Sequence, residues 1–168
     1  MNSVRVIAVG NELAADDGVG PAVIAELLRR GLPENVEALD AGADPLGVLE
    51  HLENCTLAVI IDAVLMGKPP GTVLTFPAAR ARVNIQADTF SLHGIGLAHV
   101  ISLAEKMQLP AEIIIVGIQP ETVEPGEQMS DSVKAAVSAA ADAVTMILEQ
   151  TAKGRSDDEV DAKLSPRH

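Results

Sequence analysis

The sequence contains no tryptophan and no tyrosine, and only two of its 168 residues are phenylalanine. Because 48% of the residues are hydrophobic and 21% charged, the chain is expected to fold around an aliphatic core. It has a single cysteine, Cys55, which excludes an internal disulfide framework and a metal site built from cysteines. One cysteine is typical of a reducing compartment, so we expect a cytoplasmic protein.

Basic residues are also scarce: there are 12 Lys and Arg against 24 Asp and Glu, and the net charge is −12. A surface of this sign repels a phosphate backbone, so no nucleic-acid partner is expected. No apolar run reaches the ~18 residues of a membrane span. The N-terminal apolar run ends at Gly10, too early for a secretory signal, and we expect no membrane association.

Short apolar runs and three-to-four-residue periodicities alternate along the chain. The runs predict strands over 4–9, 36–39, 57–61, 72–76 and 112–118. The periodicities predict helices over 21–30, 45–53, 94–107 and 131–148, whereas 77–92 has no clear period. This order predicts a three-layer α/β/α sandwich, with a mostly parallel, twisted sheet of about five strands and helices on both faces. We expect one domain over 1–150 and a polar, disordered tail over 151–168.

Three acidic residues are candidates for a functional site. Asp62 follows a buried apolar run, where a charge is costly to bury without a partner. It either caps a loop or helix or points into the cleft at the strand end, and we favour the cleft. Asp16 and Asp17 follow the first strand; one of them is expected to cap the first helix and the other to face the cleft.

A metal site follows if the first and third strands are neighbours, because Asp17 and Asp62 then converge. Two carboxylates this close repel each other unless a proton or a cation lies between them. The imidazole of His93, in a Leu-His-Gly segment, would complete an oxygen, oxygen, nitrogen ligand set. Such a set suits nickel or zinc better than calcium. The alternative is that His93 is an ordinary surface or core histidine.

Nucleotide-binding motifs are absent from the sequence. Asp40 follows Gly20 at the spacing of a dinucleotide fingerprint, but the glycines do not spell Gly-x-Gly-x-x-Gly. Glu12 and the two aspartates of the same loop would repel a pyrophosphate. No Gly-Lys-Ser/Thr of a phosphate-binding loop occurs.

Five short segments share a pattern with one known family. They are Val-Gly-Asn then Asp-Asp-Gly-Val-Gly over 9–20, Leu-Asp-Ala-Gly over 39–42, Ile-Ile-Asp-Ala-Val then Pro-Gly-Thr over 60–72, Ser-Leu-His-Gly-Ile-Gly-Leu over 91–97, and Val-Gly-Ile-Gln-Pro-Glu then Val-Glu-Pro over 116–125. In this order they resemble the maturation endopeptidases of nickel–iron hydrogenases. The resemblance covers about residues 4 to 150.

The resemblance implies an endopeptidase that removes a C-terminal extension from the hydrogenase large-subunit precursor once nickel has been inserted. It implies that Asp17, Asp62 and His93 bind nickel carried by the substrate, with cadmium or zinc as a surrogate. Where many members have Gly-Gly-Thr after the second strand, this chain has Ala-Gly-Ala over 41–43. This loop is expected to help select the substrate, with Asp40 and Gly42 contacting the extension.

The attacking group is expected to be a water, activated by the metal or by an aspartate acting as a general base, so the protease is aspartic-type or metal-assisted. Two other functions stay open on the sequence. One is a nickel-binding checkpoint or chaperone that binds the precursor without cutting it. The other is a small Rossmann-like hydrolase or nucleotide-binding protein that uses the region of Gly20 and Asp40.

Overall fold

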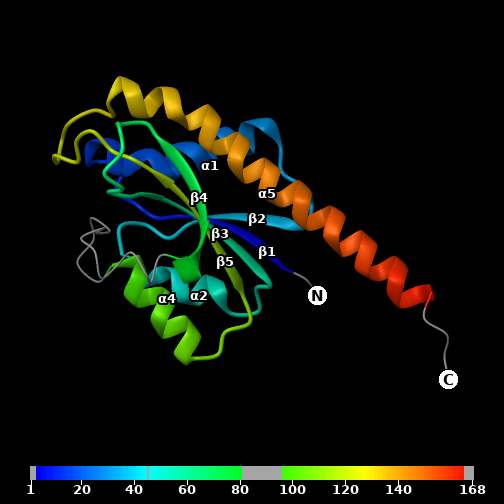
Figure 1. Ribbon diagram of the computed structural model, residues 1–168. Helices are drawn as coiled ribbons and strands as arrows, with labels where there is room; N and C mark the ends of the chain where they lie inside the picture. Colours follow the sequence, from blue (N-terminus) through cyan, green and yellow to red (C-terminus); the bar gives the residue numbers. More distant parts are fainter. Residues whose placement is uncertain (1–2, 45, 81–95, 165–168) are drawn as a thin grey trace.

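A computed structural model describes residues 3–44, 46–80 and 96–164, and its centre is a five-stranded sheet (Figure 1). Along the chain, the strands are β1 (Val4–Ala8), β2 (Val36–Asp40), β3 (Leu57–Ala63), β4 (Val73–Pro77) and β5 (Glu112–Ile118). In space their order is β2-β1-β3-β5-β4. All neighbours are parallel except β4, which pairs antiparallel with β5 at one edge. The predicted mostly parallel sheet of about five strands is confirmed.

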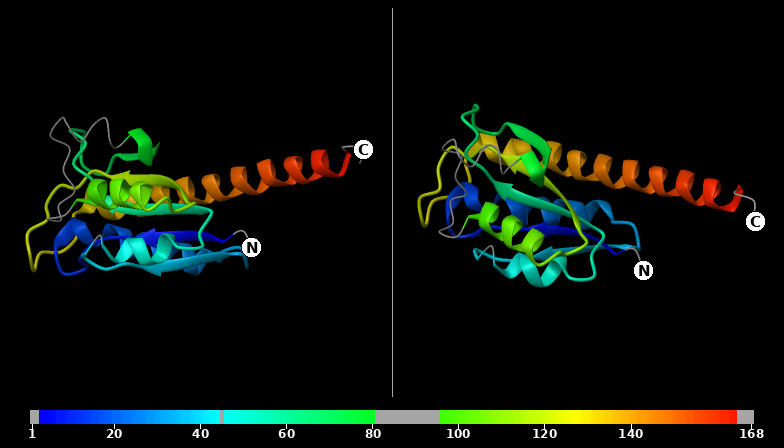
Figure 2. Two further views of the ribbon diagram at one scale, coloured as in Figure 1. Left: turned by 90° about the horizontal axis from the view of Figure 1, so that it is seen from below. Right: turned by 60° about the horizontal axis from the view of Figure 1, so that its bottom comes forward.

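Helices cover both faces of the sheet (Figures 1 and 2). On one face, α1 (Val19–Arg30) and α5 (Asp131–Leu164) pack on the sheet through one cluster of buried aliphatic residues. On the other, α2 (Gly47–Leu52) and α4 (Leu97–Lys106) pack through a second cluster. The expected three-layer arrangement is therefore present. Among the described residues no helix combines the length and the apolar character needed to cross a bilayer.

All seven residues of β3 are buried, as expected for a central strand covered on both faces. Its side chains alternate between the layers: Val59 and Ile61 belong to the cluster under α1 and α5, and Ala58 and Ile60 to the cluster under α2 and α4. By the same alternation Asp62 lies on the side of α2 and α4. The strand is longer than predicted, so Asp62 lies within it and not after it.

The last helix differs from the prediction at its C-terminal end. The segment from Thr151 was expected to be a disordered tail, but α5 continues as a helix through Leu164. Both views in Figure 2 show the end of α5 extending beyond the sheet. The apolar residues that anchor α5 end with Ile147 and Leu148 among its described side chains. The boundary of the folded domain near residue 150 stays a prediction.

The strand order creates a switch point between β1 and β3. From β1 the chain moves outward to β2 on one side, and it then returns to add β3 on the other side. In open parallel sheets, ligands bind outside the carboxyl ends of the strands where the direction of winding changes. The loops that follow β1 and β3 therefore mark the first place to search for a functional site.

Candidate functional site

Asp62 is the next-to-last residue of β3 and is fully buried, at 0% exposure. Its strand lies between β1 and β5, and its register partner on β5 is Gly117. The sequence predicts that Asp62 points into a cleft at the carboxyl end of a central strand; the structure places it at that end, fully buried, and its role in a cleft stays a prediction. A carboxylate at this depth is retained only where it interacts with other charged or polar groups.

Asp17 lies in η1 (Ala15–Gly18), the short helix between β1 and α1, and is 3% exposed. Its Oδ2 accepts a hydrogen bond from the backbone N–H of Asn11 at 2.8 Å, which closes the loop on itself. Gly10, at φ +146°, makes this return possible, because a Cβ there would collide with the carbonyl oxygen of Asp17. Asp17 is therefore a buried acid on a tightly folded loop.

Both acids lie at the end of the sheet formed by the carboxyl ends of β1 and β3. The strands β1 and β3 are direct neighbours, and the N–H of Val9 donates to the carbonyl of Ile61 at 3.0 Å. The start of α1 packs onto this junction: a Cβ on Gly20 would come within 2.8 Å of the Val9 carbonyl oxygen and 3.0 Å of that of Ile61. The short helix η1 also contacts β3. The predicted pairing of Asp17 with Asp62 requires the first and third strands to be neighbours, and this adjacency is confirmed.

His93, the third predicted ligand, lies outside the described residues, as does the rest of the Ser-Leu-His segment. Over 3–44, 46–80 and 96–164, no three His, Cys, Asp or Glu residues form a group that could hold a metal ion. The two-carboxylate, one-imidazole set therefore stays a prediction. α4 begins at Leu97, four residues after His93, and covers the face of the sheet on which Asp62 lies.

The sequence predicts that either Asp16 or Asp17 caps α1. Asp16 does not cap this helix. The N-cap of α1 is Gly18, and no side chain hydrogen-bonds there. Instead, the Asp16 carboxylate accepts hydrogen bonds from the N–H groups of Glu121, Thr122 and Ser130 at 2.7–3.0 Å, and from the Ser130 hydroxyl. Burial raises the pKa of Asp16, but these donors outweigh it, and the pKa lies below its ordinary value. Asp16 therefore fastens the loop after β5 to η1.

The substitution Asp16→Ala is expected to lower the free energy of unfolding by about 3 kcal/mol, because it leaves three part-buried N–H groups without their acceptor. Circular dichroism during urea unfolding measures the loss, since the chain has no Trp or Tyr. Asp142→Ala is the matched control, because it removes an exposed carboxylate that pairs with Arg30 at 2.6 Å. Its expected cost is below about 1 kcal/mol. Equal losses in the two variants would contradict the role of Asp16.

The loop after β2 borders the same edge of the sheet. Asp40 is exposed at the end of β2, and its Oδ1 accepts a hydrogen bond from the N–H of Gly42 at 2.8 Å. The carbonyl of Gly42 accepts one from the N–H of Gly10 at 2.9 Å. Asp40 thus shapes a turn that is tied directly to the loop of Asp17. Contact of Asp40 and Gly42 with a substrate stays a prediction.

Gln119 organises the loop after β3, a role that the sequence did not reveal. It is one of the few buried polar residues, and its Oε1 accepts hydrogen bonds from the N–H of Met66 at 2.6 Å and of Lys68 at 3.3 Å. Its backbone also pairs with Gly71 and Thr72. A glutamine directly after an apolar strand was the available signal, but its partners lie about 50 residues away along the chain.

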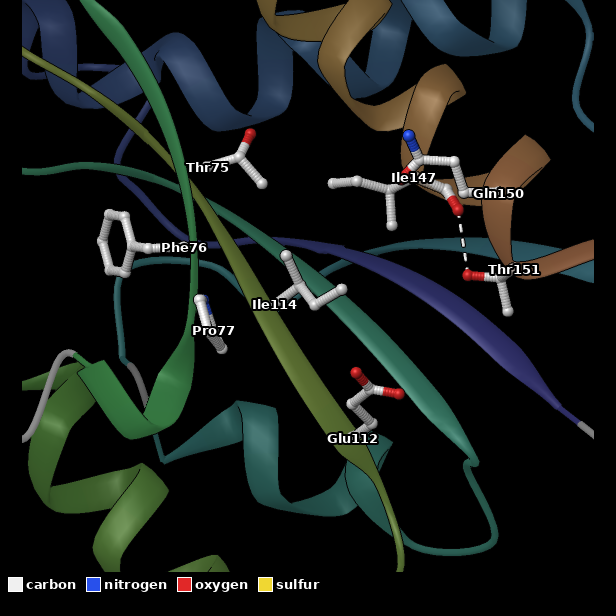
Figure 3. Close-up of a pocket in the computed structure, with 8 residues that line it drawn as sticks. All are labelled: Thr75, Phe76, Pro77, Glu112, Ile114, Ile147, Gln150 and Thr151. Atoms are coloured by element: carbon white, nitrogen blue, oxygen red, sulfur yellow. Dashed lines mark hydrogen bonds between the residues drawn. The ribbon is translucent and has the colours of Figure 1, made fainter. Parts of the chain in front are cut away.

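A pocket of about 400 Å³ lies elsewhere, between the edge of the sheet and α5 (Figure 3). It is lined by Thr75, Phe76, Pro77, Glu112, Ile114, Ile147, Gln150 and Thr151. Glu112 begins β5, whereas Asp62 pairs with Gly117 near the end of that strand. The pocket therefore lies at the opposite end of β5 from Asp62 and is separate from the candidate site.

Comparison with known proteins identifies what this arrangement is similar to. The family model described as "Hydrogenase maturation protease" matches residues 21–149. The chain is 30% identical over 151 residues to the hydrogenase 2 maturation protease of Escherichia coli, covering 88% of this chain and 92% of that protein. It is 34% identical over 123 residues to the hydrogenase expression/formation protein HupD of Rhodobacter capsulatus, covering 72% of this chain but only 59% of that one.

Solved structures agree with the sequence relatives. The hydrogenase maturating endopeptidase HybD from E. coli superposes with a TM-score of 0.78 at 28% identity, over 89% of this chain and 93% of that one. The [NiFe] hydrogenase maturation protease HybD from Thermococcus kodakarensis superposes with a TM-score of 0.70 at 31% identity, over 86% and 98%. The similarity of fold therefore covers most of the chain.

Proposed function

Because this chain belongs to the hydrogenase maturation protease family, we propose that it is an endopeptidase that removes the C-terminal extension of a nickel–iron hydrogenase large-subunit precursor after nickel insertion. The observation that carries the proposal is the placement of two buried carboxylates at the switch point: Asp62 on β3, and Asp17 in η1, which follows the neighbouring strand β1 and contacts β3. A buried acidic pair has no use in the core of a stable sheet and suits a site that receives a cation.

In the proposed mechanism, nickel arrives as part of the substrate. Asp17, Asp62 and His93 add to the ligands that the large subunit already provides, and this fixes the scissile peptide bond at the edge of the sheet. Carboxylate oxygens and an imidazole nitrogen together are a donor set that nickel accepts, and cadmium or zinc would serve as surrogates. The protein therefore needs no resident metal of its own.

Hydrolysis then requires a water and a route for one proton. The water oxygen bonds to the carbonyl carbon, the carbon–nitrogen bond breaks, and the proton lost by the water is delivered to the departing amine. An aspartate near the peptide can accept this proton as a general base. Alternatively, the metal polarises the water or the carbonyl as a Lewis acid. These two routes correspond to the aspartic-type and metal-assisted descriptions of the enzyme.

The turn after β2 is proposed to hold the extension peptide. Two hydrogen bonds fix its backbone: the N–H of Gly42 donates to the Asp40 carboxylate, and the N–H of Gly10 donates to the Gly42 carbonyl. The turn can therefore present its peptide groups without rearranging. We also propose that the reaction takes place in the cytoplasm, in keeping with the chain's lone, buried cysteine, Cys55.

The experiment that tests the proposal combines the purified protein with nickel-loaded large-subunit precursor and determines the product masses by mass spectrometry. Loss of one C-terminal peptide, with both fragments recovered, is the expected result. A stable complex without cleavage would indicate a nickel-binding checkpoint or chaperone instead. Neither binding nor cleavage would leave a small hydrolase or nucleotide-binding protein as the alternative.

A further inference from the structure

We propose that Leu13 is an anchor for the substrate: it inserts into an apolar pocket on the large-subunit precursor, and basic residues of the precursor surround that pocket. The inference rests on the proposed function and adds to it the chemistry by which the partner is recognised. Its basis is an exposed leucine on a rigid acidic loop, four residues before Asp17.

Leu13 is 77% exposed, whereas the other exposed large hydrophobic residues in the described part of the chain range from 37% to 60%. A single exposed leucine needs no special explanation in itself. Leu13 differs from the others because the loop that carries it also holds a buried acid of the candidate site. Leu28, at 60% exposure, lies in the last turn of α1, at the far end of that helix from the site.

The backbone around Leu13 is held in place on both sides. Its N–H donates to Oδ1 of Asn11 at 2.9 Å, and its carbonyl accepts from the N–H of Gly126 at 2.8 Å. Two residues later, Ala15 adopts φ +47°, a conformation that a non-glycine residue keeps only where the surroundings impose it. Asp16 then fastens the loop to the segment after β5. The leucine is therefore presented outward by a rigid loop, and little conformational entropy is lost when a partner covers it.

The charges beside Leu13 define the partner. The loop after β1 carries exposed Glu12, and the segment after β5, which binds the Leu13 carbonyl through Gly126, carries exposed Glu124 and Glu127. No Lys or Arg occurs over 6–28 or 107–133. The loop after β3 carries one basic residue, Lys68. Figure 1 shows the segment after β5 beside the start of α1. An apolar anchor with acidic neighbours on a chain of net charge −12 complements an apolar pocket with a basic rim.

The test measures cleavage of nickel-loaded large-subunit precursor as a function of its concentration. Leu13→Ser is expected to raise KM about tenfold or more, the effect of losing an interface anchor, and to leave kcat within about twofold of wild type. Leu28→Ser, an exposed leucine far from the site, is the matched control and should leave both constants unchanged. Unchanged KM in Leu13→Ser, or an equal rise in Leu28→Ser, would overturn the inference.

A binding measurement separates this inference from the proposed function. Dissociation constants for the precursor are measured in an Asp17→Asn background, with and without Leu13→Ser, so that the complex is not consumed. About tenfold weaker binding supports the anchor even if the wild type proves unable to cleave, whereas equal binding rejects it. Glu124→Gln with Glu127→Gln should reduce the salt dependence of binding, since charged rims act through screened forces. A salt dependence equal to that of wild type would reject the basic partner surface.

Discussion

Asp17→Asn is expected to reduce processing of the precursor by at least about 100-fold, the scale on which a positioned acid or base contributes. The substitution keeps the shape of the side chain and retains one oxygen, which can still accept the N–H of Asn11 now bound at 2.8 Å. It removes the negative charge that we propose as a nickel ligand or general base. Activity should therefore fall much more than stability, as followed by mass spectrometry and by circular dichroism.

The control for Asp17→Asn is Asp142→Asn, the same chemical change at an exposed ion pair between α5 and Arg30. This variant should process precursor at the wild-type rate. Wild-type processing by Asp17→Asn would remove Asp17 from the site. Loss of the fold in Asp17→Asn would show that its carboxylate, like that of Asp16, holds the loop together.

The fold could be predicted from the sequence because its signals are local. The apolar run before Asp62 has no alternation, which is the pattern of a strand covered on both faces, and β3 is such a strand. Asp17 and Asp62 were candidates from charge and position before the family resemblance implied the same two residues. The position of Asp62 at the end of a central strand followed from the same run, although the strand proved longer than the run itself.

The role of Asp16 could not be predicted, because its partners are distant in the chain. An aspartate just before a helix ordinarily caps it, but the donors for Asp16 come from Glu121, Thr122 and Ser130, more than 100 residues away. No local pattern encodes that proximity. The fold of the Asp17 loop likewise depends on contacts with the segment after β5, which is distant in the chain.

The last prediction concerns the metal in the substrate: a precursor that lacks nickel is expected to resist cleavage even when its C-terminal extension is intact. Asp17, in η1, and Asp62, in β3, are buried carboxylates on elements that contact each other, and negative charges brought together repel until a cation arrives. A site of this kind gains most from a partner that brings the cation with it. The protein would then recognise a completed metal centre, and the extension would be removed only after nickel insertion.

The measurement compares nickel-loaded with nickel-free precursor at equal concentration, with product masses followed over time. The nickel-loaded form should be processed at least about 100-fold faster, because the metal supplies both the positioning and the charge that the acidic pair requires. Adding nickel to the metal-free precursor should restore processing when the metal enters its site. Efficient cleavage of the nickel-free form would leave a protease that reads only peptide sequence, with Asp17 and Asp62 acting as an acid–base pair.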